Sequence, residues 1–328
     1  MFVVLAVAGC AAPLPHDASP QEGLNLLLQG DAKAALEVFD RIDPGQVTPQ
    51  RTQAIACIRD HFEKPLPHED LDPEAGAVLS AYERYWRAVM MKREAPRQGE
   101  AHLLAALNRM PMLADAPDHS SIDSVTDHLV TALAKRHLHA ITGKTQPYYE
   151  LMIWRSEEPR SYDIDLPEER VTVKVVLMSG FASFGWAGFA TCGVAQTGGW
   201  AKPDALYAVR SSYDLESETF HVSYLAHEGQ HFADYAKYPR LEQPELEYRA
   251  KLTEVALSRE TTKDLLEKFA TLGGTDRAVP HAFANRQVWL ALRDLPPERA
   301  REVAAAKLRE STALLNRLGA ATTTQFLR

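Results

Sequence analysis

Apolar residues recur at helical spacing through most of the first half of the chain. Apolar positions within 24–28 and 35–39 flank the pair Gly30-Asp31, which predicts two short helices joined by a turn. Asp72-Pro73 is a typical cap and first-turn pair at the start of another helix. Further helices are predicted over about 48–62, 72–92, 99–109 and 121–142, the last one ending at Gly143.

The pattern changes near Pro147, where β-branched and aromatic residues replace the helical spacing. Strands are predicted over 149–154, 171–177 and 205–209, with a Gly-rich stretch over 180–199. A helix beginning within 217–219 must end before Pro239. Two long helices are predicted over about 244–272 and 282–318, the second broken at Pro296-Pro297. This order predicts an α+β fold, with a helical domain over 21–145 and a second domain with a small sheet over 146–328.

Length and charge restrict the function. A chain of 328 residues is long enough for about two domains. The net charge of −8, without a basic run, makes nucleic acid an unfavourable partner. No apolar stretch reaches the ~18 residues that a membrane-spanning helix requires. Three cysteines are too few for a disulfide scaffold, so we expect Cys57 and Cys192 to be buried thiols in different domains, with a bridge between them the less favoured alternative.

The chain opens with an apolar run that ends in Val7-Ala8-Gly9-Cys10. This segment resembles the lipobox of bacterial lipoproteins. The resemblance implies a signal and tether over residues 1–20, a lipid on Cys10, attachment to the membrane through that lipid, and the periplasmic face of the outer membrane. The first basic residue is Lys33, whereas a secretory signal begins with positive charge, so we expect that translation starts further upstream or that the chain was trimmed. The alternative is a buried N-terminal element with a structural Cys10.

Residues 27–39 resemble one helix-turn-helix unit of the tetratricopeptide repeat. No second copy follows at a 34-residue period, and a solenoid needs about three copies, so we expect a single helical hairpin. A helical domain of this kind would be a possible surface for a protein partner.

The residues His227-Glu228-Gly229-Gln230-His231 form the motif HExxH. On a helix, His227 and His231 point the same way and can bind Zn²⁺ through neutral imidazoles. Glu228, beside them, can act as general base toward a water molecule. The motif and the preceding strand 205–209 resemble zincin metallopeptidases, which implies a peptide or protein substrate. The alternative is a solvent-facing helix with two structural histidines.

The third ligand separates the zincin families. Asp234 and Lys237 occupy positions where metzincins have Gly and His, and residues 274–276 match the aspzincin motif only with broken spacing. Glu247-Tyr248-Arg249-Ala250 resembles the ExxA of gluzincins. We therefore expect Glu247 as the third ligand and Glu254, two turns further on, as a carboxylate that braces a zinc-bound imidazole. Glu254 or Glu245 as the ligand remains open.

A donor that stabilises the oxyanion should come from elsewhere in the chain. His281, directly after Pro280, is the main candidate, and Tyr235, Tyr238 and Tyr248 are alternatives. Together these features predict a lipid-anchored zinc metalloendopeptidase with Zn²⁺ as its cofactor. The alternative is a helical scaffold lipoprotein whose zinc site is structural or vestigial. A structural zinc site has no need of a general base, so the role of Glu228 separates the two.

Overall fold

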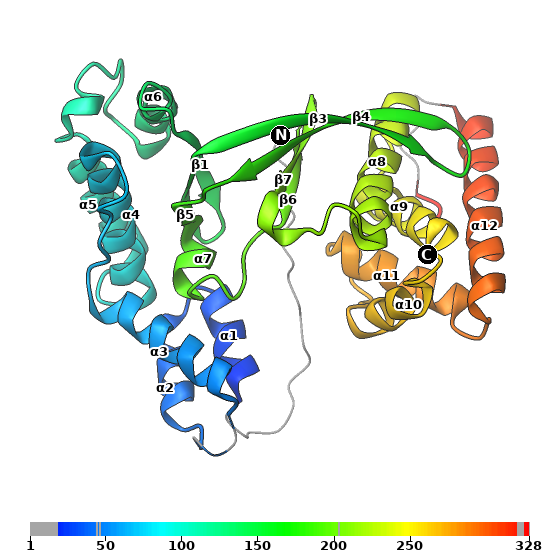
Figure 1. Ribbon diagram of the computed structural model, residues 1–328, viewed down its shortest axis with the longest axis horizontal. Coiled ribbons are helices and arrows are strands. Elements are labelled where there is room, and N and C mark those ends of the chain that lie inside the picture. Colours follow the sequence, from blue (N-terminus) through cyan, green and yellow to red (C-terminus); the bar gives the residue numbers. More distant parts are fainter. Residues whose placement is uncertain (1–18, 44, 46, 203, 320–324, 328) are drawn as a thin grey trace. The chain divides into compact units, whose positions relative to one another are not determined.

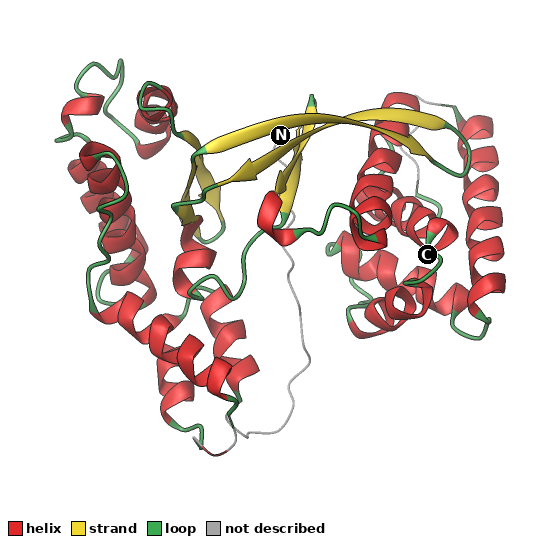
Figure 2. Ribbon diagram, viewed as in Figure 1, coloured by secondary structure: helices red, strands yellow, loops and turns green. Residues whose placement is uncertain are grey.

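The computed structural model describes residues 19–43, 45, 47–202, 204–319 and 325–327. The candidate lipobox and Cys10 lie outside these residues. The fold mixes helices with two small sheets, as the α+β prediction states (Figure 2). Across the described ranges, none of the helices combines enough length and apolarity to cross a membrane.

The described chain forms two compact units. The helical unit contains the described residues between 19 and 157 together with 178–198. The HExxH unit contains residues 158–177 and the chain from 199 onward. The chain passes between the units within two strands, β3 (Ser156–Asp165) and β4 (Arg170–Ser179), and again between residues 198 and 199. The predicted boundary at residue 145 therefore differs from this division, because strand residues such as Tyr148, Leu151 and Ile153 belong to the core of the helical unit.

The helices of the helical unit follow the predicted order. They are α1 (Pro20–Leu28), α2 (Ala32–Asp40), α3 (Pro49–Glu63), α4 (Pro73–Met90), α5 (Pro96–Leu107) and α6 (Ile122–Ala134). Helices α1 and α2 form the expected hairpin around Gly30, whose φ of +81° suits a residue without a Cβ. Asp72 caps α4 by accepting hydrogen bonds from the amides of Glu74 and Ala75. Trp86 of α4 is fully buried in the unit's core.

The predicted helix over 121–142 is wrong in its second half. Helix α6 ends at Ala134, and residues 139–145 form strand β1 (His139–Thr145). His137 adopts the left-handed conformation, and the amide of Leu138 donates to the carbonyl of Leu133, which closes the helix well before Gly143. Strand β1 pairs antiparallel with β2 (Tyr148–Trp154), which pairs with the short β5 (Ser183–Phe184). Helix α7 (Gly185–Ala190) follows β5.

The sheet of the HExxH unit has the order β3-β4-β7-β6. Strands β6 (Gly199–Lys202) and β7 (Ala205–Val209) are antiparallel neighbours. Apolar residues of β3, β4 and β7 share one buried cluster with the helix that carries the motif. A Cβ at Gly229 would lie 3.1 Å from Ile164 Cδ1 and 3.4 Å from Val171 Cγ2, so the glycine of the motif lets this helix lie close against the sheet.

The helix that carries the motif is continuous but changes its winding. Residues 219–226 form a π-helical segment, η4 (Thr219–Ala226), and α8 (His227–Lys237) continues it as an α-helix from the first histidine. It ends before Pro239, as predicted. π-helical turns are rare and tend to occur beside functional sites. Phe220 and Tyr224 of this segment belong to the cluster on the sheet.

The remaining helices are α9 (Gln243–Leu257), α10 (Thr262–Thr271), α11 (Pro280–Leu292) and α12 (Pro297–Leu318). Helix α9 contacts α8, α11 and α12 (Figure 1). The predicted break at Pro296-Pro297 is confirmed, but the single helix over 244–272 is wrong. The Glu218 carboxylate accepts hydrogen bonds from the amides of 259–261 and from the Thr261 hydroxyl, which stabilises a corner between α9 and α10.

Candidate metal centre

The motif places two imidazoles on one face of α8, turned toward α9. His227 and His231 are 5% and 8% exposed, and their Nε2 atoms lie 3.1 Å apart. Glu247, in the second turn of α9, directs its carboxylate between them. Its Oε1 is 3.4 Å from His231 Nε2, and its Oε2 is 3.6 Å from His227 Nε2. The structure thus brings His227, His231 and Glu247 together as a buried group of ligand atoms within 4.8 Å of one another.

Glu254 lies on the other side of His227. Its Oε1 is 2.6 Å from His227 Nδ1, and a carboxylate can only accept, so Nδ1 carries the hydrogen. In the neutral imidazole the lone pair is then on Nε2, which faces His231 and Glu247. Burial opposes the charge on Glu254, but Lys251 and His227 lower the pKa of its carboxyl.

The ligand atoms that converge here would all be stabilised by a positive charge. Two imidazole Nε2 atoms and two carboxylate oxygens meet at one buried point, where Glu247 Oε2 also forms an ion pair with His281 Nδ1 but makes no hydrogen bond of good geometry. Burial alone would lower the pKa of His231, yet the nearby Glu247 carboxylate raises it to about 9. Conversely, although burial opposes it, His231 holds the pKa of Glu247 well below its ordinary value. A divalent cation would satisfy all four atoms, and two histidines with one glutamate are a donor set that Zn²⁺ accepts.

Glu228 is buried beside this group but is not part of it. The side chain is 5% exposed, and it makes no hydrogen bond or ion pair with any residue that the structure describes. Its charge acts on two neighbouring phenols. Burial, with a further contribution from Glu228, raises the pKa of Tyr213 to about 12, and the pKa of Tyr224 is raised as well. A buried carboxylate without a partner is free to exchange a proton with a bound molecule.

His281 lies in the first turn of α11, as expected from Pro280, and its side chain is 34% exposed. Its Nδ1 is 2.7 Å from Glu247 Oε2, and its ring is stacked 6.5 Å from that of His227. The structure therefore places His281 against the candidate ligand carboxylate. Of the alternative donors, Tyr235 is 45% exposed with its ring 6.2 Å from that of His231, whereas the Tyr238 hydroxyl donates to Asn316.

A buried polar network, which sequence reasoning missed, joins α8 to α9. Arg249 and Asp234 are 2% and 1% exposed, and the guanidinium donates to both carboxylate oxygens at 2.8 and 2.9 Å. Gln230 donates to Asp234 and accepts from Thr253. Asp234 follows His231 by three residues and Arg249 follows Glu247 by two, so this network fixes the two helices at the level of the candidate ligands.

Glu245, the remaining alternative ligand, is directed elsewhere. It is fully buried, and its carboxylate accepts from Arg277 at 2.8 and 3.0 Å and from the amides of Phe326 and Leu327. These contacts place Glu245 in an ion pair that holds the segment 325–327, and they use both of its oxygens.

A second group of possible ligands lies in the helical unit and consists of Cys57, His61 and Cys192. Its two sulfurs are joined in a disulfide, so they offer no thiolate in this form. The expectation of free thiols in different domains is wrong, because α3 and the turn after α7 belong to the same unit and bring the Cα atoms to 6.0 Å.

Comparison of the chain with protein-family models, with curated proteins and with solved structures found no match in any of the three.

Proposed function

We propose that the HExxH unit is a zinc-dependent metallopeptidase. His227, His231 and Glu247 would hold the zinc ion, and Glu254 would keep His227 in the tautomer that presents Nε2. The observation that supports this most directly is the combination of a converging buried donor set with Glu228, which stands beside it unpaired. A structural site would use its protein groups to close the coordination and would not need such a base.

The chemistry follows from the residues around the donor set. Bound zinc supplies a Lewis acid that lowers the pKa of a water molecule and polarises the carbonyl of a peptide bond. Glu228 takes a proton from the attacking water and later delivers it to the departing amine. His281 remains our candidate for a donor to the carbonyl oxygen. From its position against Glu247 in the structure, it would have to turn toward the substrate to do so.

The location is part of the same proposal. We propose that lipid on Cys10 anchors the chain at the periplasmic face of the outer membrane, as the resemblance to a lipobox implies. The peptidase substrate would then be a peptide or protein of the cell envelope.

The test combines metal content with hydrolysis. Purified protein is analysed for zinc and incubated with a mixture of internally quenched peptides. Wild type and Glu228→Gln should each retain about one zinc ion per chain, His231→Ala should lose it, and only wild type should cleave. Glu302→Gln, an exposed substitution on α12, is the matched control and should behave like wild type. Zinc without cleavage in wild type would favour the structural alternative, and absence of zinc would overturn the metal assignment.

A further inference from the structure

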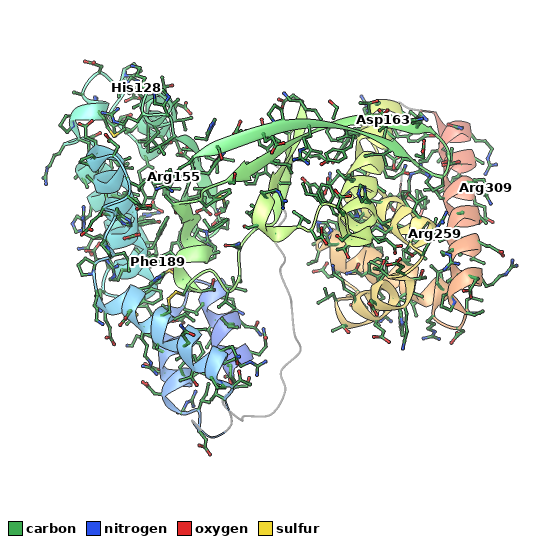
Figure 3. All side chains as sticks on the ribbon, in the orientation of Figure 1. His128, Arg155, Asp163, Phe189, Arg259 and Arg309 are labelled. Atoms are coloured by element: carbon green, nitrogen blue, oxygen red, sulfur yellow. A yellow bond between two sulfur atoms is a disulfide. The ribbon has the colours of Figure 1, made fainter. Side chains whose placement is uncertain are left out.

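The helical unit contains a disulfide with an imidazole beside it. Cys57 and His61 are one helical turn apart on α3, and Cys192 follows α7, near Phe189 (Figure 3). His61 Nε2 lies 3.4 Å from Cys192 Sγ and 3.8 Å from Cys57 Sγ. All three side chains are partly exposed. A reagent could therefore reach the group without unfolding of the unit.

The orientation of the imidazole is fixed by a backbone group. His61 Nδ1 lies 2.7 Å from the carbonyl oxygen of Phe189, and because a carbonyl can only accept, Nδ1 carries the hydrogen. The Phe189 ring also stacks on the imidazole, with centroids 5.3 Å apart. The lone pair of a neutral His61 is thus on Nε2 and faces the sulfurs. A disulfide has no proton to offer this lone pair, whereas a thiol has one.

We propose that Cys57, His61 and Cys192 form a redox-active thiol–disulfide site that exchanges with a dithiol, and that His61 carries the proton to and from Cys192. His61 Nε2 takes the proton of one thiol of the dithiol, and the resulting thiolate attacks Cys57 Sγ and forms a mixed disulfide as the bond between Cys57 and Cys192 breaks. The released electron pair stays on Cys192 Sγ, which takes a proton from His61 Nε2. The second thiol of the dithiol then displaces Cys57, so the dithiol is oxidised to a disulfide and the protein gains two thiols.

The surroundings fit this direction of attack. Gln53, Ala56 and Asp60, which flank Cys57 on α3, are exposed, so an incoming thiol can approach that sulfur. Cys192 is the sulfur nearer to His61, and a leaving thiolate departs faster when its pKa is low. A positive charge lies near the backbone of His61, because Arg87 donates from Nε to the His61 carbonyl at 2.7 Å. Its positive charge favours a thiolate at this point as well.

The inference is independent of the metal centre, because every residue it uses belongs to the helical unit. A disulfide that only stabilises the fold would require neither an accessible sulfur nor an imidazole with its lone pair directed at both sulfurs. The difference between the two roles is kinetic, and it can be measured on the intact chain.

The experiment follows reduction of the full-length protein by dithiothreitol at pH 7, with released thiols counted and the fold monitored by circular dichroism. We expect wild type to be reduced while it remains folded, and His61→Ala to react about threefold to tenfold more slowly. Added imidazole should restore part of the rate in His61→Ala. His119→Ala, a histidine substitution elsewhere in the same unit, should react like wild type. Reduction that occurs only with unfolding, or equal rates in wild type and His61→Ala, would overturn the proposal.

A second measurement on reduced wild type covers the case in which His61→Ala does not fold. Iodoacetamide should alkylate Cys192 faster than Cys57 near neutral pH, because the neighbouring imidazole favours the Cys192 thiolate. Equal or reversed rates, read by mass spectrometry of the two peptides, would contradict the assignment of His61 to Cys192.

Discussion

The pair Asp234 and Arg249 offers the sharpest prediction about how the candidate centre is held. Asp234→Leu removes both carboxylate oxygens from a guanidinium that is 2% exposed and leaves it with Ser311, Thr312 and, at 3.9 Å, Glu168 as side-chain partners. Two charge-assisted hydrogen bonds are lost, at about 1.5–3 kcal/mol each. Removing one partner of a buried ion pair costs about 3–5 kcal/mol. We therefore expect the free energy of local unfolding of the helices that carry the pair to fall by this amount.

The assay is amide hydrogen exchange read on peptides of α8, α9 and α12, because global unfolding would mix the two compact units. Asp234→Leu combined with Arg249→Met should recover most of the loss, since apolar residues of similar size can replace a buried ion pair. Glu302→Gln breaks an exposed pair on α12, with side chains 63% and 65% exposed, and should cost less than about 1 kcal/mol. The reasoning would be refuted if Asp234→Leu cost no more than this control, or if the double variant lost as much as the sum of the single ones.

Three further predictions concern separate parts of the chain. Glu247→Ala should weaken zinc binding more than about 100-fold, and Glu254→Gln should weaken it about 10–100-fold. Competition with a chelator measures both affinities, and the reverse order would make Glu254 the ligand. Burial raises the pKa of the Glu150 carboxyl to about 7 in the folded protein, whereas the unfolded chain has the ordinary pKa of 4.5. Between these two pH values the folded state keeps a proton that the unfolded chain has released. Stability of the helical unit should therefore fall by about 1–3 kcal/mol from pH 4.5 to 7, and amide hydrogen exchange on peptides of this unit should show no such fall in Glu150→Gln. Cys10→Ser should move the protein from the membrane fraction to the soluble fraction, and unchanged fractionation would contradict the anchor.

Local patterns predicted the elements of this chain well where the determining contacts are local. The strands over 149–154, 171–177 and 205–209 and the helix with the motif follow from residue type and spacing. The same spacing placed Glu247 and Glu254 on one helix face. The structure brings the first to the Nε2 atoms and the second to Nδ1 of His227. Their roles toward zinc remain predictions.

What could not be predicted depends on partners that are distant in the chain. The corner after α9 is stabilised by Glu218, some forty residues earlier, and nothing near Ser258 identifies it. The disulfide needs α3 beside the turn after α7, a contact over 135 positions. Asp234 entered the sequence analysis only as a residue that excludes metzincins. Its ion pair with Arg249 depends on the packing of two helices and leaves no local pattern.

The π-helical segment that leads into His227 has a consequence for how this gene can change. A backbone hydrogen bond in a π-helix spans five residues, one more than in an α-helix, so its turns are wider. Loss of a single codon within 219–226 would let the segment rewind as an α-helix. The residues before 219 would then keep nearly the same orientation relative to the motif, because the rotation lost with one residue is regained as the wider turns tighten. The change would be confined to the π-helical turns themselves, which include Phe220 on the sheet, while HExxH remained intact. A one-codon deletion is therefore better tolerated within 219–226 than within α8, where it would turn the two ends of the helix by about 100° relative to one another.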